Sequence, residues 1–493
     1  MASQPNVVLV VTDTTRADDA FDPRVAPTLA ELGRDGTRAT RAFSTAPWTL
    51  PSHGSLFTGT SPSKHGAHAE HERLDGGSPD EDGLPVLAEL FADAGYETVG
   101  LSNNTWVSTE GGFARGFETF QQMWQLVQSS AAIGEIDDVL EESRSRALLR
   151  AIFDGPGNPL VNAANVLYHF LARGNAEGGG ERTTRWIENW LADRDEDRPF
   201  FLFANYLEPH LEYRPPERLA DRHLPEGVSY EEAMEIPQEP WRYLAGEVEL
   251  TDHELQVLRE LYRAEISAFD EHLAALKASL QAAGEWEDTL LVVVADHGEN
   301  IGHHGMMDHQ YCLYDSLLHV PLVLHGDAFE GGEEVTDLVS VADIAPTLLD
   351  AAGIDAPDAR SEFQGRSFHP SSETDPREFV VAEYMGPQPT MEALEQHVDE
   401  IPEHVSELNR SLRAIRTEDW KLIRGSDGST ELYDLDADPT EGRNLAADRP
   451  EQVEVLSEKL DEWLDSFEEA ESAGDVSLDP ERKAQLEELG YLR

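Results

Sequence analysis

Cysteine is almost absent from this chain. Cys312 is the only one among 493 residues, which excludes an intramolecular disulfide and a thiolate metal cluster. Long apolar runs are lacking too: nowhere do 18 apolar residues follow one another, as a membrane-spanning helix would require. The N-terminal residues also lack the basic and apolar regions of a secretory leader. We therefore expect a cytoplasmic protein with no integral membrane segment.

Basic side chains are scarce. The chain has 37 Lys and Arg against 97 Asp and Glu, a formal net charge of −60, and only five of the basic residues are lysine. Such a surface excludes nucleic acid as a partner, because a phosphate backbone needs a basic face. Molar salt would screen the self-repulsion of this charge. The composition resembles that of haloarchaeal proteins and favours adaptation to a salt-filled cytoplasm, the alternative being a merely acidic protein.

The apolar residues that are present predict an α/β fold. Hydrophobic residues make up 40 % of the chain, enough to bury a core and to exclude a disordered protein. Four runs have the length and β-branched content of buried parallel strands, at 6–11, 199–207, 289–295 and 319–324. Helical patterns lie between them, at 25–36, 84–95, 181–193 and 255–283. This alternation indicates a mostly parallel central sheet flanked by helices.

Two further regions differ from this pattern. Residues 121–180 read as a mostly helical insertion ending in a Gly-rich loop. Beyond about residue 370 the chain changes to short strands, at 379–384, 414–417, 420–424 and 431–434, followed by an acidic amphipathic helix at 450–472. We therefore predict a catalytic domain at 1–368, which contains the insertion, and a smaller α+β C-terminal domain at 369–493 with a small antiparallel sheet.

Polar, potentially ligating residues follow three of the predicted strands. Asp13 comes after the first, His210 lies within Glu208-Pro209-His210, and Asp296-His297 ends the third. Ligands in α/β sheets bind beyond the carboxyl ends of the strands. Carboxylate and imidazole groups suit Zn or Mn and, less well, Mg or Ca. Together with the histidines that follow (His303, His304 and His309), these residues predict a divalent metal site.

A second cluster contains hydroxyl groups. Residues 46–59 (APWTLPSHGSLFTG) place Thr49 and Ser52 just before a predicted helix. A hydroxyl there can act as a nucleophile, since backbone N–H groups and the helix dipole favour an anion at that end. Alternatively, Thr49 or Ser52 simply caps the helix. The spacing alone leaves both interpretations open.

Several of these segments resemble the sulfatase family, which belongs to the alkaline phosphatase superfamily of metal-dependent hydrolases. The resemblance runs in order from residue 5 to about 445 and leaves mainly the predicted insertion uncovered. Its segments are 5–18, 49–59 with Pro62 and His65-Gly66, 95–98, 111–120, Pro209-His210 with Tyr213, 296–299, Val320-Pro321, 419–423, and 431–435 with Asp438-Pro439.

The resemblance implies roles for individual residues. Asp13, Asp296 and His297 match metal ligands, and Thr14 stands where the family often has a second Asp ligand. Thr49 occupies the nucleophile position of the family's Cys/Ser-x-Pro-x-Arg motif and would also touch the metal. The resemblance places His210 opposite the charged oxygens of the substrate. Asn104, His309 and His53, which replaces the motif's Arg, are expected to contact substrate or serve catalysis; His304 or His309 would hold a second metal, protonate the leaving group or activate water.

Threonine at position 49 is the main departure from the family. Sulfatases oxidise a Cys or Ser there to formylglycine, whose sulfate ester can collapse by expelling sulfate as the aldehyde re-forms. We expect no formylglycine at Thr49. A sulfated threonine has no such exit, whereas water attacking phosphorus beside a metal can open a phosphorylated one.

The sequence therefore predicts a metal-dependent hydrolase of sulfate or phosphate esters with Thr49 as nucleophile. One alternative is a phosphodiesterase or phosphotransferase with a phospho-threonine intermediate. Others are a sulfate-ester hydrolase that uses Thr49 directly or relies on metal-bound hydroxide, and a non-catalytic member that binds an anionic glycan or lipid headgroup. The expected partner is a small-molecule, glycan or lipid-headgroup anionic ester, and the metal and the oligomeric state stay open.

Overall fold

The computed structural model describes residues 4–69, 72–74, 83–123, 179–194 and 198–470. The predicted helical insertion at 121–180 lies almost entirely outside these residues. At its borders are strand β4 (Thr119–Gln122) and helix α8 (Gly179–Asp193).

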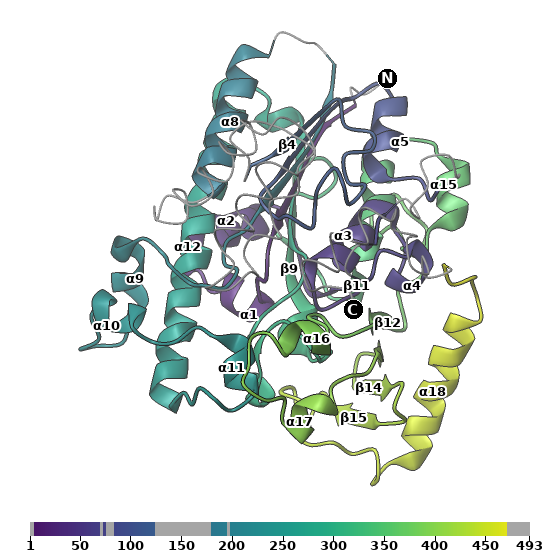
Figure 1. Cartoon of the computed structure of the whole chain (residues 1–493). Helices are drawn as coiled ribbons and strands as arrows, with labels where there is room; N and C mark the ends of the chain where they lie inside the picture. Colours follow the sequence, from purple (N-terminus) through teal and green to yellow (C-terminus); the bar gives the residue numbers. More distant parts are fainter. Residues whose placement is uncertain (1–3, 70–71, 75–82, 124–178, 195–197, 471–493) are drawn as a thin grey trace, which may run out of the picture.

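A central sheet runs through the larger part of the molecule (Figure 1). The order of its strands is β10-β2-β9-β6-β1-β5-β3-β4, with β11 also paired to β2. Their bounds are β1 Asn6–Thr12, β2 Thr37–Phe43, β3 Glu97–Ser102, β5 Phe200–Tyr206, β6 Thr289–Ala295, β9 His319–His325, β10 Glu333–Val335 and β11 Val339–Ser340. The strands from β6 to β4 are all parallel, which confirms a mostly parallel sheet.

One predicted strand has the opposite direction. β9 pairs antiparallel with β6 and with β2, so the expectation that 319–324 forms a parallel strand was wrong. Five of its seven residues are buried. A strand covered on both faces reads as a continuous apolar run in either direction, and its composition therefore carries no information on orientation.

Helices cover both faces of the sheet, and the alternation along β1 shows how. Leu9 and Val11 face a core shared with α3 (Thr49–Thr58), α5 (Leu87–Asp93) and α14 (Ile344–Ala351). Val8 and Val10 face the opposite core, with α2 (Pro27–Asp35), α8 and α12 (Asp252–Ala283). In Figure 1, α8 and α12 lie on one side of the sheet and α3 and α5 on the other. Successive strand side chains point to opposite faces, so the apolar run of β1 feeds both cores.

The C-terminal part forms a second, antiparallel sheet, as predicted. Its order is β12-β13-β14-β15, with bounds Val380–Tyr384, Leu412–Arg416, Trp420–Gly425 and Thr430–Asp434. Ala382 and Ala414 on one face join the core that contains α3, whereas Ile415 and Leu422 on the other pack against α18 (Pro450–Leu464). The acidic helix α18 ends at Leu464, eight residues before the predicted end at residue 472. The boundary at 368/369 remains a prediction.

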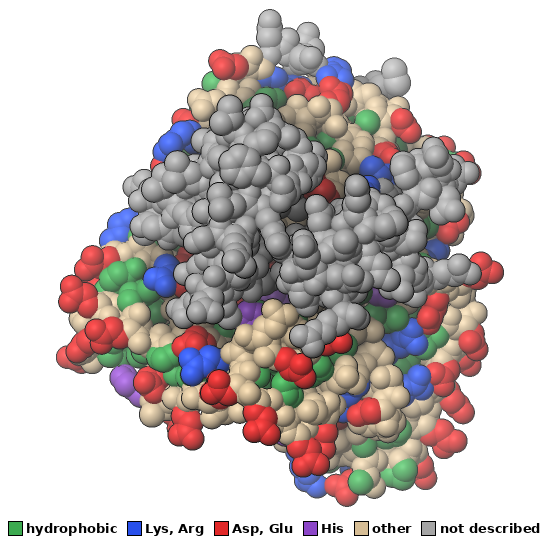
Figure 2. Space-filling view, in the orientation of Figure 1, with side chains coloured by type: hydrophobic (Ala, Val, Ile, Leu, Met, Phe, Trp, Pro, Cys, Tyr) green, Lys and Arg blue, Asp and Glu red, His purple; other side chains and the backbone are tan. Residues whose placement is uncertain are grey.

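On the coloured part of the face shown in Figure 2, Asp and Glu side chains outnumber Lys and Arg. Among the described residues, each helix is too short or too polar to cross a membrane.

Candidate active site

The metal-ligand candidates meet at one edge of the central sheet. β1 lies between β6 and β5, and all three are parallel, so their carboxyl ends share this edge. Asp13 directly follows β1, and its N–H donates to the carbonyl of Tyr206 at the end of β5. Asp296 directly follows β6, and its N–H donates to the carbonyl of Thr12. The backbone ladder therefore fixes the two aspartates side by side.

Helix α3 brings Thr49 to the same edge. The helix begins at Thr49, after Trp48 in extended conformation. Ser52 in its first turn donates from Oγ to the carbonyl of Asp296 at 2.6 Å, which fastens the helix N-terminus to the end of β6. Thr49 is 2 % exposed, and its Oγ1 lies 3.4 Å from Nε2 of His297, next to Asp296 in the chain. The interpretation of Thr49 as no more than a helix cap is not supported, because no side-chain cap bond is present at this end.

Three side-chain oxygens lie around one imidazole nitrogen. Nε2 of His297 lies 3.4 Å from Oγ1 of Thr49, 3.5 Å from Oδ2 of Asp296 and 3.7 Å from Oδ1 of Asp13. One ligand atom from each of Asp13, Asp296 and His297 lies within 4.8 Å of the others. This spacing is close enough for the three side chains to bind one divalent cation.

The electrostatics of Asp13 and Asp296 also favour a bound cation. Oδ1 of Asp13 and Oδ2 of Asp296 are buried and have no hydrogen-bond partner among the described residues. Burial raises the pKa of Asp13, and burial together with the charge of Asp13 raises the pKa of Asp296 well above its ordinary value. Two buried carboxylates facing each other are unfavourable unless a cation lies between them. The donor set thus fits a divalent metal ion.

His297 is oriented as a ligand. Its Nδ1 lies 3.0 Å from the carbonyl oxygen of Gly298. A carbonyl only accepts, so Nδ1 carries the proton and Nε2 keeps its lone pair directed at the cluster. Burial lowers the pKa of this imidazole well below its ordinary value, which keeps Nε2 unprotonated.

Asn104 holds the nucleophile candidate next to the metal-ligand candidate. Its Nδ2 donates to Oδ2 of Asp13 at 2.6 Å and to Oγ1 of Thr49 at 3.2 Å, and its Oδ1 accepts from the N–H of Trp106. Both amide hydrogens and the oxygen are engaged. The expected contact between Asn104 and substrate therefore has no free donor, and the structure gives this side chain a positioning place instead.

His53 lies beneath the site. Its Nδ1 lies 3.0 Å from the Thr49 carbonyl oxygen and 3.4 Å from Oδ2 of Asp296. The ring is fully buried, packs against Phe113 and Phe203, and burial lowers its pKa to about 4. The neutral, enclosed imidazole contacts both Thr49 and Asp296, and its contact with substrate stays a prediction.

His210 and His309 complete the cluster from two loops. The His309 ring lies 4.6 Å from the ring of His297 and 5.3 Å from that of His210, measured between centroids. Nδ1 of His210 lies 2.5 Å from the carbonyl of Leu211, so its Nε2 is the free nitrogen. Burial lowers the pKa of His309, but Asp308 and Glu299 outweigh it and raise that pKa well above the ordinary value.

Two other predicted site residues are placed differently. Thr14 contacts Asp296 through its backbone N–H at 3.2 Å, while its buried hydroxyl has no hydrogen-bond partner among the described residues. His304 is exposed and stacks on Tyr314 at 3.8 Å, in the turn of the hairpin formed by β7 (Asn300–Ile301) and β8 (Met307–Asp308). The turn directs His304 away from the cluster, and no contact between them occurs in the described part of the chain.

Glu299 and Asp308 are the site residues that sequence reasoning missed. Both are buried, and their carboxylates lie 3.7 Å and 2.5 Å from Nδ1 of His309. The available signal was the short hairpin pattern with Gly302 and Gly305 at its turn, which pairs Asn300 with Asp308 and so brings Glu299 near His309.

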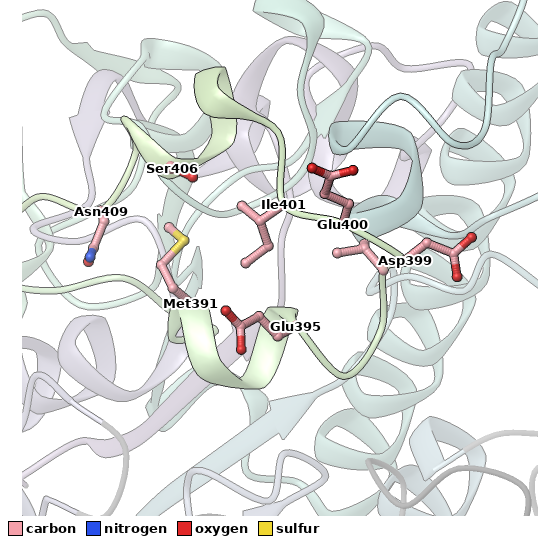
Figure 3. Close-up of a pocket in the computed structure, with 8 residues that line it drawn as sticks. Met391, Glu395, Asp399, Glu400, Ile401, Ser406 and Asn409 are labelled. Atoms are coloured by element: carbon pink, nitrogen blue, oxygen red, sulfur yellow. The ribbon is translucent and has the colours of Figure 1, made fainter.

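A separate cavity of about 600 Å³ lies in the C-terminal part (Figure 3). It is lined by Met391, Glu395, Val398, Asp399, Glu400, Ile401, Ser406 and Asn409. None of the predicted site residues lines this cavity, and it is distinct from the cluster around Asp13 and Asp296.

Comparison with known proteins identifies the family. The family described as "Sulfatase" matches residues 5–354, and "N-sulphoglucosamine sulphohydrolase, C-terminal" matches residues 302–470. The chain belongs to the sulfatase family. Arylsulfatase K of Bos taurus is 24 % identical over 483 residues, which cover 92 % of this chain and 81 % of that protein.

Solved structures share the sulfatase fold. The phosphonate monoester hydrolase of Silicibacter pomeroyi is 21 % identical, with a TM-score of 0.67 over 97 % of this chain and 98 % of that one. The structure described as BT4656 in complex with its substrate, D-glucosamine-2-N,6-O-disulfate, is 18 % identical, with a TM-score of 0.65 over 95 % of this chain and 100 % of that one. This sulfatase-family chain is an ester hydrolase, and dependence on a divalent metal is typical of its family.

Proposed function

We propose that this chain is a metal-dependent hydrolase of phosphate esters in which Thr49 is the nucleophile. The observation that carries the proposal is the placement of Oγ1 of Thr49, 3.4 Å from Nε2 of His297, within the set that includes the unpartnered oxygens of Asp13 and Asp296. A hydroxyl that shares a metal site with three ligands is placed for activation.

Asp13, Thr49, Asp296 and His297 would hold the cation. A divalent ion bound there supplies Lewis acidity, which lowers the pKa of the Thr49 hydroxyl and polarises an oxygen of the substrate. The Thr14 hydroxyl remains a candidate additional ligand, since it is buried and unpartnered.

Thr49 would attack phosphorus in line. Oγ1 gives its proton to solvent as its bond to phosphorus forms, the bond to the leaving oxygen breaks, and the departing alkoxide or aryloxide takes a proton from His309. Water then attacks phosphorus and returns a proton to His309, while Thr49 leaves, regains a proton as the alcohol, and the phosphate is released. The N-terminus of α3, a ten-residue helix, presents backbone N–H groups and the positive end of its dipole toward the developing anion.

Histidines, in place of Lys or Arg, would stabilise the negative charge of the substrate. The hydrogen bonds and ion pairs of Asp13, Asp296, Glu299 and Asp308 within the described residues include no Lys or Arg. We assign His210 to the charged oxygens of the substrate and His309 to the leaving oxygen or the attacking water. In each ring Nδ1 is already engaged, so Nε2 is the nitrogen that would act.

Threonine at position 49 favours a phosphate ester over a sulfate ester as the substrate. A sulfated Thr49 could leave only by a second displacement at sulfur, because it lacks the second oxygen of a hydrated aldehyde. Displacement at phosphorus next to a metal provides that second step. Relatives named for sulfate-ester cleavage, such as arylsulfatase K, support sulfate hydrolysis by water as the second candidate.

The substrate we propose is an anionic ester on a glycan, a lipid headgroup or a small molecule. Support comes from the structural neighbour BT4656, whose substrate is a disulfated glucosamine. The net charge of −60 would repel such an anion in dilute buffer. Molar salt removes this long-range repulsion, so we place the activity in a salt-rich setting.

The decisive test compares p-nitrophenyl sulfate, p-nitrophenyl phosphate and bis(p-nitrophenyl) phosphate at molar KCl with Mn, Zn, Mg or Ca. We expect phosphoester turnover that falls at least a thousandfold in Thr49→Ala and is partly retained in Thr49→Ser, which keeps a hydroxyl. Sulfate release that survives in Thr49→Ala would overturn the proposal and assign the attack to water.

A further inference from the structure

The hairpin of β7 and β8 brings two carboxylates to one nitrogen of His309. The strands pair antiparallel with Asn300 opposite Asp308, and the carboxylates of Glu299 and Asp308 lie 3.7 Å and 2.5 Å from Nδ1. Carboxylates accept hydrogen bonds, so Nδ1 carries a proton and Nε2 is the nitrogen left for the substrate. The His309 side chain is 12 % exposed, in contrast to the enclosed carboxylate of Glu299.

Both oxygens of Asp308 are engaged. Oδ1 accepts from the backbone N–H of His309 at 2.7 Å and contacts Nδ1 at 2.5 Å, and Oδ2 accepts from Nε2 of Gln310 at 3.1 Å. The backbone of Asp308 is in the left-handed region, with a φ of 74°. Non-glycine residues hold this conformation where surrounding contacts fix it, and such positions cluster at functional sites.

Gln310 links Asp308 to Trp241 of helix α11 (Pro240–Leu244). Its Oε1 accepts a hydrogen bond from the indole Nε1 of Trp241 at 3.2 Å. The carboxylate of Asp308 only accepts and the indole N–H only donates, so the amide of Gln310 has one possible orientation. The two hydrogen bonds from the indole to the carboxylate therefore have a fixed direction, and the carboxylate contacts Nδ1 of His309 at 2.5 Å.

From Trp241 the contacts continue into the C-terminal part of the protein. The Trp241 ring packs against His397 at 3.9 Å between centroids, and Trp241 and Met391 contribute to one small apolar cluster. Close to the hairpin, Tyr311 donates from its hydroxyl to the carbonyl of Pro389 at 2.8 Å. In Figure 1, α11 and α16 (Met391–Leu394) lie next to each other below the central sheet.

We propose that Asp308, Gln310 and Trp241 form a positioning relay through which the C-terminal segment 389–397 fixes the ring of His309 toward the reaction centre. The proposal rests on the proposed function in placing His309 beside the substrate. Asp308 holds the Nδ1 edge of the ring, Gln310 prevents rotation of that carboxylate, and Trp241 anchors Gln310.

A double-mutant cycle on the metal-loaded full chain tests the relay. Trp241→Phe removes the indole N–H and keeps a ring against His397. We expect kcat on the aryl ester turned over fastest to fall about tenfold with little change in KM, because a misdirected catalytic ring slows chemistry more than binding. In a His309→Ala background the same substitution should have no effect on kcat.

Two further variants sharpen this test. Gln310→Met keeps the length of the side chain, removes both hydrogen bonds and should reproduce the loss. Trp190→Phe is the matched control: its indole donates to Glu97 at 3.1 Å, on α8 and outside the relay, and kcat should be unchanged. An equal loss from Trp241→Phe with and without His309 would overturn the relay and indicate a merely structural role.

A measurement that needs no turnover separates this proposal from the proposed function. Proton NMR of protein with selectively ¹⁵N-labelled histidine should show a low-field Nδ1 proton that disappears in His309→Ala and in Asp308→Asn and weakens in Trp241→Phe. Its persistence in Asp308→Asn would overturn the relay. Activity that survives Thr49→Ala would overturn the nucleophile assignment and leave this signal unchanged.

Discussion

Nε2 of His297 lies 3.4 Å from Oγ1 of Thr49, although 248 residues separate the two along the chain. The contact joins the first residue of α3 to the loop after β6, and the bond from Ser52 to the carbonyl of Asp296 holds the two elements together. The Thr49 hydroxyl is thereby held next to the metal-ligand candidate His297 before any substrate binds.

Metal binding should depend on the aspartates with unpartnered oxygens. We expect about one divalent ion per chain, measured by elemental analysis, and at least a tenfold weaker affinity in Asp13→Asn and Asp296→Asn. The ion should also raise the free energy of unfolding by about 2.7 kcal/mol at a hundred times its Kd. Asp270→Asn is the control, since that buried carboxylate accepts from the backbone at the start of α2. Unchanged metal content in Asp13→Asn would contradict the assigned ligand set.

Gly298 should be indispensable for the loop that carries His297 and Glu299. A Cβ on Gly298 would lie 2.2 Å from the carbonyl oxygen of Ser316, and its N–H already donates to Leu317 at 2.7 Å. We expect Gly298→Ala to displace the loop and lower metal affinity and kcat at least tenfold. Gly386→Ala, where a Cβ meets nothing within 4 Å, should match the wild-type enzyme in both assays. Wild-type metal affinity in Gly298→Ala would show that the loop tolerates the shift.

Lys421 should be a major source of stability at the contact between the two sheets. It is fully buried, and its Nζ lies 2.7 Å from both Asp315 and Glu441. Lys421→Met leaves the buried carboxylate of Glu441 without its cation and leaves Asp315 with Arg416 alone, so we expect a loss of about 3–5 kcal/mol in denaturant unfolding. Lys459→Met breaks an exposed pair with Glu378 and should cost about 0–1 kcal/mol. Equal losses in the two variants would contradict this difference in burial.

Glu265 should make stability fall as pH rises. Burial, with a further contribution from the charge of Glu208, raises the pKa of this carboxyl to about 8. Because the folded-state pKa exceeds the unfolded value, its stabilising effect is complete below pH 4.5 and is lost as pH rises toward 8. Glu265→Gln should flatten the free energy of unfolding across this range, by an amount on the order of a few kcal/mol. The exposed Glu188→Gln on α8 should leave the pH profile as it is, and a profile unchanged in Glu265→Gln would refute the assignment.

Much of the fold followed from local patterns. The run 289–295 predicted β6 to the residue, and the predictions for β1 and β5 differ from the structure by one or two residues at their ends. The direction of β9 could not be predicted, because its neighbours in the sheet come from distant parts of the chain. The end of α18 was also placed too far along, since an amphipathic acidic pattern continues beyond the last turn that packs on the small sheet.

The candidate site, too, could be predicted only in part from the sequence. The order of the motifs along the chain identified Asp13, Thr49, Asp296 and His297 as a set. The sequence predicted His309 as catalytic and His304 as substrate-binding, but left open which of them would hold a second metal, protonate the leaving group or activate water. Only the hairpin decides between them: it pairs Asn300 with Asp308, turns His304 outward and places His309 against two carboxylates.

The sequence by itself therefore determined the family, the alternation of strands and helices and the chemical types at the strand ends, because these depend on local patterning and on residue identity. The tertiary structure alone decided which atoms face one another. It engaged Asn104 with Asp13 and Thr49, enclosed His53 behind Asp296, and joined His309 to Trp241 through Asp308 and Gln310. Such contacts join residues far apart in the chain, and their geometry is set by the packing of whole elements.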